Sequence, residues 1–418
     1  MLTMGQKMAV TGELRDRYQK SKKREKITIL NEFTKLTGYN RCYASQILNQ
    51  SKLLGYVHVA GQTIKYIRDH KKRRKKKRYY DHDVLIALKK LWEGADFICS
   101  KRLAPYLEEY ITVLEKFKEI KLTYEVREKL LTISPATIDR LLAPVRKKQE
   151  LKGRSTTRPG SLLKKNIPIR TYNEWDDRRP GFFEVDLVSH DGGNYRGDFI
   201  HSLQFTDIAI CWTEMVGVKN KAQRWVFEGI REIRDRLPFP ILGFDSDNGS
   251  EFINDELIRY CEKEQITFTR ARPYRKNDSC YIEQKNWSVI RRTVGYGRHD
   301  TEEELRVLNQ LYSNLRLYVN FFQPVRKLVQ KERMGSRIKK RYDVAQTPYR
   351  RALSSPHLPD EIKVKLTTLY DKLNPAELKR EISRLQNELY RLNTLKQNRD
   401  REIDKSKKAQ NIFDYIST

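Results

Sequence analysis

The sequence predicts a multidomain α+β protein: helical helix-turn-helix modules at the N-terminus, a central mixed α/β sheet, a small basic segment containing strands, and a C-terminal helix. Three observations lead to this prediction. Apolar residues recur at helical spacing in the N-terminal part of the chain, with short turns between the runs. Beyond Pro180 the runs become strand-like and then alternate with amphipathic helices, as in a sheet covered by helices. A length of 418 residues allows two to four domains.

The charge of the chain indicates a polyanionic partner. The formal net charge is +30, which nucleic acid explains more readily than an anionic membrane surface. No apolar run approaches the ~18 residues of a membrane span, and no secretory signal is visible. We therefore expect a protein of the prokaryotic cytoplasm and nucleoid, or of the nucleus in a eukaryotic host. The five cysteines are scattered and never spaced as C-x-x-C, so we expect neither disulfides nor structural zinc.

A helix-turn-helix DNA-binding module is predicted within residues 1–70. Residues 29–36 and 41–48 have helical spacing, and residues 37–40 form a short turn. The second helix carries Arg41 and Gln46, with Ser45 and Asn49 beside them, and these side chains are able to reach base edges or phosphates in a major groove. An ordinary helical hairpin is the alternative.

Eight consecutive cations follow, in a predicted basic linker at residues 71–82. They are Lys71, Lys72, Arg73, Arg74, Lys75, Lys76, Lys77 and Arg78. Such a block repels itself and is expected to stay extended until phosphates neutralise it. We predict DNA-backbone contact, and a solvated linker or a nuclear-import signal remains an alternative.

A second helical DNA-binding module is predicted at residues 83–148. Ser134 and Pro135 form a helix start, with serine as the cap and proline at the first helical position. Residues 123–131 and 135–146 are therefore expected to form another helix-turn-helix. Residues 149–172 are rich in glycine, proline and cations, and a linker is predicted there.

The central sheet is predicted at residues 173–318. Three strand-like runs come first, and a helix, a strand, a helix, a strand and a last helix follow. In chain order these elements span residues 182–188, 199–208, 211–218, 221–237, 241–244, 254–264, 266–269 and 278–293. Three hairpin-linked strands followed by alternating helices and strands describe a mixed sheet covered by helices.

Three carboxylates in this region are candidates for a metal site. Asp186 lies inside an apolar run, Asp247 follows the fourth strand, where α/β sheets place their ligand crevice, and Glu283 lies 36 positions further, in the first turns of a helix. Oxygen ligands favour Mg²⁺ or Mn²⁺ over zinc. Singly, each acid has a bland interpretation as a turn or surface residue, and Asp245 is a rival for Asp247 because it has the same strand parity. His190 shares the face of Asp186, where proton transfer and simple packing are both open as roles.

At these residues the sequence resembles the DDE transposases of bacterial insertion-sequence type, which have a retroviral-integrase-like catalytic core. The resemblance covers about residues 165–350 and rests on Asp186, on the box Asp247-Asn248-Gly249-Ser250-Glu251-Phe252, and on Glu283 after 35 intervening residues. Residues 268–278 and 283–287 add to it. It implies an RNase H-like fold for the central sheet.

The resemblance also implies an activity. Asp186, Asp247 and Glu283 would bind two Mg²⁺ (or Mn²⁺) ions per active site, and would support hydrolysis at transposon ends and then transfer of the 3′-hydroxyl into target DNA. The implied partners are double-stranded DNA, as terminal repeats and target, and further copies of the chain in a homodimer or a larger homo-oligomer. Two alternatives stay open: a DNA-binding regulator with an inactive transposase-derived core, and a metal-dependent RNase H-like nuclease.

Four residues around the catalytic helix are implied as DNA contacts. Lys276 and Asn277 would contact the backbone of the transposon end, and Arg291 and Arg292 would contact phosphates, although a solvated helix face explains the two arginines equally well. Two features depart from the family. The His-His-Cys-Cys zinc module of retroviral integrases is absent, and residues 279–281 differ from the Gln-Ala-His type of sequence expected before the glutamate.

The C-terminal part of the chain carries two further predictions. Residues 319–360 are expected to form a small basic domain, with β structure as one option, from strand-like pieces at 318–324 and 327–351. A helix is expected at residues 373–403, with Asn374 and Pro375 as its start. Its apolar residues alternate at spacings of four and three: Leu378, Ile382, Leu385, Leu389 and Leu392. This spacing fits either a dimeric coiled coil or a helix packed on its own chain.

Overall fold

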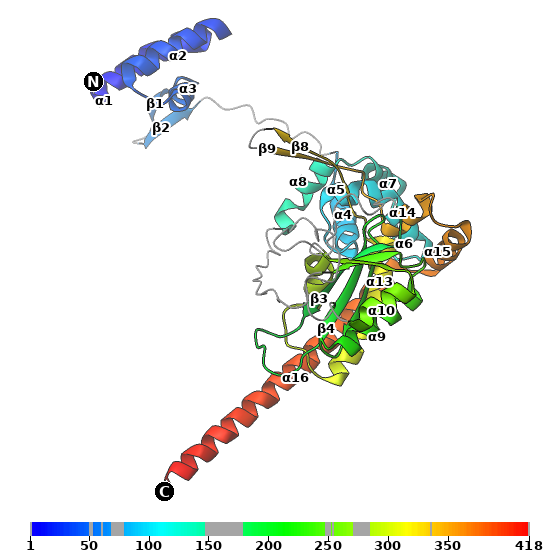
Figure 1. Ribbon diagram of the computed structural model, residues 1–418. Coiled ribbons are helices and arrows are strands. Elements are labelled where there is room, and N and C mark those ends of the chain that lie inside the picture. The colour runs from blue at the N-terminus through cyan, green and yellow to red at the C-terminus, as the bar shows by residue number, and fades with distance from the viewer. Residues whose placement is uncertain are drawn as a thin grey trace. The chain divides into compact units, whose positions relative to one another are not determined.

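A computed structural model describes most of the chain in two compact units, Met1–Arg78 and Tyr79–Thr418, each of which is treated by itself (Figure 1). The described residues are 2–49, 53–59, 62–67, 79–146, 179–246, 252, 255–270, 285–334 and 337–416. The predicted linker at 149–172 therefore lies outside the described residues, as does most of the one at 71–82.

The first unit contains the predicted pair of helices. They are α2 (Lys23–Thr37) and α3 (Arg41–Asn49), and α1 (Met4–Lys20) precedes them. Helix α2 ends where Gly38 takes a left-handed conformation with φ of +69°, which glycine adopts without a steric penalty. The three helices share a small apolar core that includes Ile29, Phe33, Ala44 and Leu48.

After α3 the predicted module also contains a hairpin that the sequence analysis did not predict. Strands β1 (Leu53–Val59) and β2 (Gln62–Ile67) pair there as an antiparallel hairpin. The signal was present in the sequence, because Val57 and Val59 alternate with polar residues and Thr63 and Ile64 are β-branched.

The second unit begins with a bundle of short helices. They are α4 (His82–Gly94), α5 (Ser100–Leu103), η1 (Ala104–Tyr106), α6 (Leu107–Lys116), α7 (Tyr124–Leu131) and α8 (Pro135–Arg146). Local caps start two of them: the Asp81 carboxylate accepts a hydrogen bond from the Val84 N–H at 3.1 Å, and Thr123 caps α7. The helices predicted at 123–131 and 135–146 are thus confirmed.

A five-stranded mixed sheet follows, as predicted. Its strands are β3 (Phe182–Ser189), β4 (His201–Asp207), β5 (Thr213–Val218), β6 (Gly243–Ser246) and β7 (Thr267–Arg270), in the spatial order β5-β4-β3-β6-β7. Strand β4 is antiparallel to β3 and β5, whereas β6 is parallel to β3 and β7. Helices α9 (Gln223–Arg236) and α10 (Asp255–Lys263) make the crossovers between the parallel strands.

The two faces of this sheet differ in chemistry. One face, which we call the apolar face, carries Phe183, Val185, Leu203, Phe205 and Phe244, and α9 packs on it. Gly229 of α9 makes this packing close, since a Cβ there would lie 3.0 Å from Leu203 Cδ2. The other face, which we call the polar face, carries Glu184, Asp186, Ser202, Gln204, Thr206, Asp245 and Thr269.

Helix α13 (Glu302–Phe322) covers part of the polar face and closes one edge of the sheet. Asn320 donates to the Thr213 carbonyl and accepts from the Thr213 N–H, both at 2.8 Å. Asn309 makes the same pair of bonds to Gly217, at 2.6 and 3.2 Å. The two asparagines lie eleven residues apart, about three helical turns, so one helix satisfies the outer edge of β5, where a further strand would otherwise pair.

Two C-terminal predictions need correction. Residues 318–322 are not strand-like but end α13, because Thr301 and Glu304 form a capping box that starts a 21-residue helix. The C-terminal helix α16 (Pro375–Ile416) starts where predicted but extends past residue 403. Its apolar seam packs on α13 and the core of its own chain, and this buries Leu378, Ile382, Leu385 and Leu389.

The separate domains predicted between residues 83 and 403 form one compact unit. The basic segment contributes only the hairpin of β8 (Leu328–Met334) and β9 (Arg337–Tyr342), and α14 (Pro348–Ser354) and α15 (Asp360–Lys372) follow. Val113 of α6, Tyr349 of α14 and Tyr370 of α15 all enter the apolar core of the sheet, which joins these pieces. Within the described residues, no helix is long and apolar enough to cross a membrane.

Candidate active site on the polar face of the sheet

Asp186 is the one member of the predicted triad that lies within the described residues. It sits on the polar face of β3 and is half-buried. Its Oδ1 accepts a hydrogen bond from the Leu187 N–H at 2.8 Å, and its Oδ2 accepts one from the Asn286 side-chain amide at 2.5 Å. Both of these donors are neutral groups.

The contact with Asn286 brings the segment after Glu283 to Asp186. Asn286 begins a π-helical stretch, η2 (Asn286–Arg291), which continues into α12 (Arg292–Val294). Short π-helical stretches within helices are frequent at functional sites. Glu283 itself lies outside the described residues, but it precedes Asn286 by three positions. Sequence reasoning assigned no role to Asn286, although its spacing of about one helical turn from Glu283 was a usable signal.

Strand β6 approaches Asp186 from the other side. It runs parallel to β3, with Glu184 paired to Asp245 and Val185 paired to Ser246. Asp247 is the next residue in the sequence. It lies outside the described residues, as do the predicted DNA contacts Lys276, Asn277 and the cationic run 71–78.

The rival Asp245 and a second buried acid, Asp207, have structural partners. Asp245 is buried and its Oδ1 accepts a hydrogen bond from the Thr269 hydroxyl at 2.7 Å. Asp207 is buried and accepts from the N–H groups of Gly181 and Ile210, both at 2.7 Å. Each of these carboxylates therefore holds the local backbone or a neighbouring strand.

His190 is a packed histidine. It is fully buried, and its Nε2 lies 2.7 Å from the Ser202 hydroxyl, which in turn bonds to Tyr312 of α13. Burial lowers the pKa of His190 well below its usual value, so its imidazole is neutral near pH 7. The simple packing alternative therefore accounts for this residue.

The two predicted arginine contacts lie in different surroundings. Arg291 stacks over the Tyr296 ring at 5.0 Å. Arg292 donates to the Asp96 carbonyl at 2.7 Å and so ties α12 to the helical bundle. Next to them, the Lys285 side chain is buried, and burial, helped by the positive charge of Arg102, lowers its pKa to about 8.

In the first unit, Arg41 and Gln46 are exposed on α3. Ala44 and Leu48 lie on the opposite side of that helix and are buried in the core. Arg41 also bonds to Asn31 of α2. The exposed side of α3 is thus polar and is presented by a helix whose other side is anchored.

The described residues do not by themselves form a metal site, since no group of three His, Cys, Asp or Glu side chains among them could hold an ion. Asp186 supplies hard carboxylate oxygen, the donor that Mg²⁺ and Mn²⁺ prefer. The donor set fits a divalent ion only if Asp247 and Glu283 join Asp186.

No family model matches the chain. Among solved structures, the HTLV-2 integrase catalytic core domain in complex with magnesium (dimeric form) is 14% identical, with a TM-score of 0.27, and covers 35% of this chain and 91% of its own. The catalytic core domain of BIV integrase is 18% identical, with a TM-score of 0.29, and covers 42% and 96%. TM-scores this low carry no argument about function.

A curated relative is much closer in sequence. The uncharacterized protein y4rM of Sinorhizobium fredii (strain NBRC 101917 / NGR234) is 37% identical over 341 residues, which are 82% of this chain and 93% of that protein. At this identity and coverage, the chain belongs to the same family as y4rM.

Proposed function

We propose that this chain is a DNA transposase of the DDE type, which hydrolyses DNA at element ends and joins the freed 3′-hydroxyl to target DNA. One observation carries the proposal: Asp186 lies on the polar face of β3 where two other segments converge. Ser246, the residue before Asp247, is paired with the residue before Asp186. Asn286, three residues after Glu283, donates to Asp186 itself.

Asp247 therefore follows a residue that pairs next to Asp186, and Glu283 precedes by three positions a residue that bonds to Asp186. We infer that the three acids meet at Asp186. When bound there, two Mg²⁺ ions would stabilise the charge that develops on the attacking and leaving oxygens of a phosphoryl transfer. Asp186, Asp247 and Glu283 would hold the ions. Asn286 would orient the Asp186 carboxylate through its side-chain amide, because a hydrogen bond to a ligand fixes the geometry of that ligand.

Charge and the first unit support DNA as the substrate. The formal net charge of +30 favours a polyanion. Helix α3 exposes Arg41 and Gln46, side-chain types that pair with guanine and adenine edges in a major groove. We propose that α3 reads the element end.

A strand-transfer assay tests the proposal. The full chain is incubated with Mg²⁺, labelled DNA ends taken from the sequences that flank its gene, and a target plasmid. We expect joined products, and we expect Asp186→Asn, Asp247→Asn and Glu283→Gln each to abolish them. Asp235→Asn is the matched control, since Asp235 is an exposed acid on α9, over the apolar face.

The assay also separates the alternatives. Cleavage without joining would identify a nuclease, and binding without cleavage would identify a regulator with an inactive core. Equal activity in Asp186→Asn and Asp235→Asn would refute the proposed site.

A further inference from the structure

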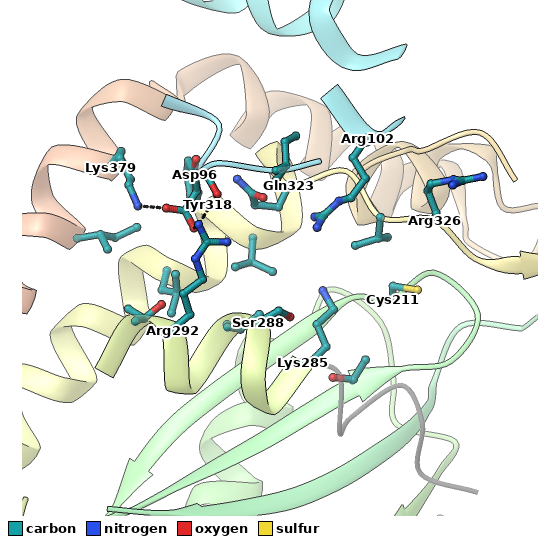
Figure 2. A pocket seen from close by; sticks show the side chains of 18 of the residues that line it. Asp96, Arg102, Cys211, Lys285, Ser288, Arg292, Tyr318, Gln323, Arg326 and Lys379 are labelled. Atoms are coloured by element: carbon teal, nitrogen blue, oxygen red, sulfur yellow. Dashed lines mark hydrogen bonds and ion pairs between the residues drawn. The ribbon is translucent and has the colours of Figure 1, made fainter. Parts of the chain in front are cut away.

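A cavity of about 590 Å³ lies in the second unit, beside the polar face of the sheet. Its walls come from the helical bundle, the η2 segment, α13, the β8–β9 hairpin and α16 (Figure 2). This volume is within the range of about 300–1,000 Å³ that small-molecule sites occupy. The cavity is lined by six cations, Arg102, Lys285, Arg292, Arg326, Lys340 and Lys379, and among the lining residues only Asp96 is acidic.

Asp96 accounts for two of the six cations. Its carboxylate lies 2.6 Å from Lys379 Nζ and 3.5 Å from Arg292 Nη2. These three residues form a closed ion-pair group at one end of the cavity. The positive charge of the remaining four cations is therefore not balanced by an acid of the cavity wall.

Arg102 and Lys285 face each other across the cavity. Figure 2 shows the Arg102 guanidinium and the Lys285 ammonium pointing into the same space from opposite walls. Arg102 uses its Nε to bond the Pro324 carbonyl. No hydrogen bond or ion pair joins Lys285 Nζ to another residue in the part of the chain that the structure describes, although this side chain is only 8% exposed.

Two facing cations are costly here, because Lys285 is buried and Arg102 is half-buried. Burial of a charge without a counter-charge costs free energy, and a like charge nearby adds to the cost. An anion between the two groups removes both penalties. Arg102 offers a planar fork of N–H donors that suits phosphate oxygens, and Lys285 offers a point charge.

We propose that this cavity binds a phosphate-bearing ligand of about nucleotide size, with a phosphate group held between Arg102 and Lys285. The site contains none of the three proposed catalytic acids and does not rest on the proposed transposase activity. Its ligand is either a free phosphorylated molecule or one phosphate of a nucleic-acid strand whose end enters the cavity.

Equilibrium dialysis with radiolabelled pyrophosphate tests the proposal on the full chain. The buffer contains a chelator, which removes divalent ions from the candidate metal site. It also contains about 0.15 M salt, which screens the exposed surface charges. We expect one saturable site per chain. Arg102→Gln and Lys285→Met are each expected to weaken binding about tenfold or more, since each removes a charge-assisted hydrogen bond.

Two controls separate this site from other features of the chain. Arg306→Gln removes an exposed cation of α13 that does not line the cavity, and we expect it to bind pyrophosphate within about twofold of the unaltered chain. Asp186→Asn is expected to bind pyrophosphate as well as the unaltered chain does. The binding result therefore does not depend on whether the transposase proposal is correct.

Cys211 gives a second readout that does not depend on the variants folding. Its side chain is buried and lines the cavity, Cys261 is buried elsewhere, and Cys42 and Cys99 are exposed. Alkylation of these four thiols is compared by mass spectrometry over times long enough to label the buried ones. Pyrophosphate is expected to slow labelling of Cys211 alone.

Two outcomes would overturn the proposal: no saturable binding, or binding that Arg102→Gln, Lys285→Met and Arg306→Gln weaken equally. Cys211 labelling that is unaffected by saturating pyrophosphate would also overturn it. A parallel titration with a 5′-phosphorylated thymidine tetranucleotide distinguishes the two sources. Preference for the oligonucleotide assigns the site to a strand end, and preference for pyrophosphate assigns it to a free phosphorylated ligand.

Discussion

The two faces of the central sheet are both covered by helices, yet they are built from different residues. The apolar face, which lies under α9, carries Phe183, Leu203 and Phe205, and these residues form part of the apolar core. The polar face carries Glu184, Gln204 and Thr206, which are equally inaccessible to solvent. Buried polar groups add less to stability than apolar packing does, so this concentration of polar residues indicates that this side of the sheet serves a site.

Two acids make the difference concrete. Glu214 pairs with Phe205 on the neighbouring strand, lies on the apolar face and is fully buried. Its oxygens accept from Trp212 Nε1 at 2.9 Å, from Arg236 Nε at 3.1 Å and from Arg316 Nη2 at 2.8 Å. Asp186 on the polar face is half-buried and accepts from two neutral amides. A carboxylate bound by two arginines is structural, whereas the bonds from Leu187 and Asn286 orient the Asp186 carboxylate through neutral donors.

The largest effect is expected from Asp186→Asn. Loss of a metal-binding carboxylate removes several kcal/mol of transition-state stabilisation, which is on the order of 10³-fold or more in strand transfer. The free energy of unfolding should change by less than about 1 kcal/mol, because the carbonyl oxygen of the introduced amide can still accept a hydrogen bond. Urea unfolding and the joining assay measure the two quantities. A large loss of stability would show that Asp186 is structural like Glu214.

The reverse result is expected from Glu214→Gln. Removing the buried charge of Glu214 takes the acidic partner from Arg316 and leaves Arg236 with only Glu232, which costs about 3–5 kcal/mol of stability. Glu232 is the matched control, since it pairs with the same Arg236 at 3.0 Å but is 55% exposed. Glu232→Gln should cost less than about 1 kcal/mol. Equal unfolding midpoints for Glu214→Gln and Glu232→Gln would show that burial does not make Glu214 a structural acid.

Asn286→Ala sharpens the role of the polar face. Loss of an outer-shell hydrogen bond to a metal-binding residue typically costs about 10–100-fold in metal affinity or activity. We expect strand transfer to fall by that factor at low Mg²⁺ and to recover in part as Mg²⁺ is raised. A purely structural defect would lower activity equally at every Mg²⁺ concentration.

The smallest effect is expected at the edge of the sheet. Asn320→Ala leaves the buried N–H and C=O of Thr213 unpaired, which costs about 1–3 kcal/mol of stability. Asn314→Ala on the same helix removes only a local bond to the Gln310 carbonyl and should be nearly neutral. Thermal unfolding compares the two, and similar melting temperatures would show that α13 does not protect the edge.

Much of the central unit could be predicted because its signals are local. Strand alternation and the Asn374–Pro375 helix start both act within a few residues. Asp186 was placed correctly on its strand for the same reason. Asp247 and Glu283 remain predictions. Asn286 follows Glu283 by about one helical turn, but its contact with Asp186 spans 100 residues and has no local signal.

The sequence by itself determined where the helices and strands of the sheet lie, the charge of the chain and the strand that carries Asp186, since these depend on periodicity and caps. Only the tertiary structure decided that the Leu378–Ile382–Leu385 seam packs on its own chain, that Glu214 is a structural acid, and that Arg102 and Lys285 share a cavity. The physical reason is that burial and charge pairing depend on residues far apart in the sequence, and no local pattern records which of them meet.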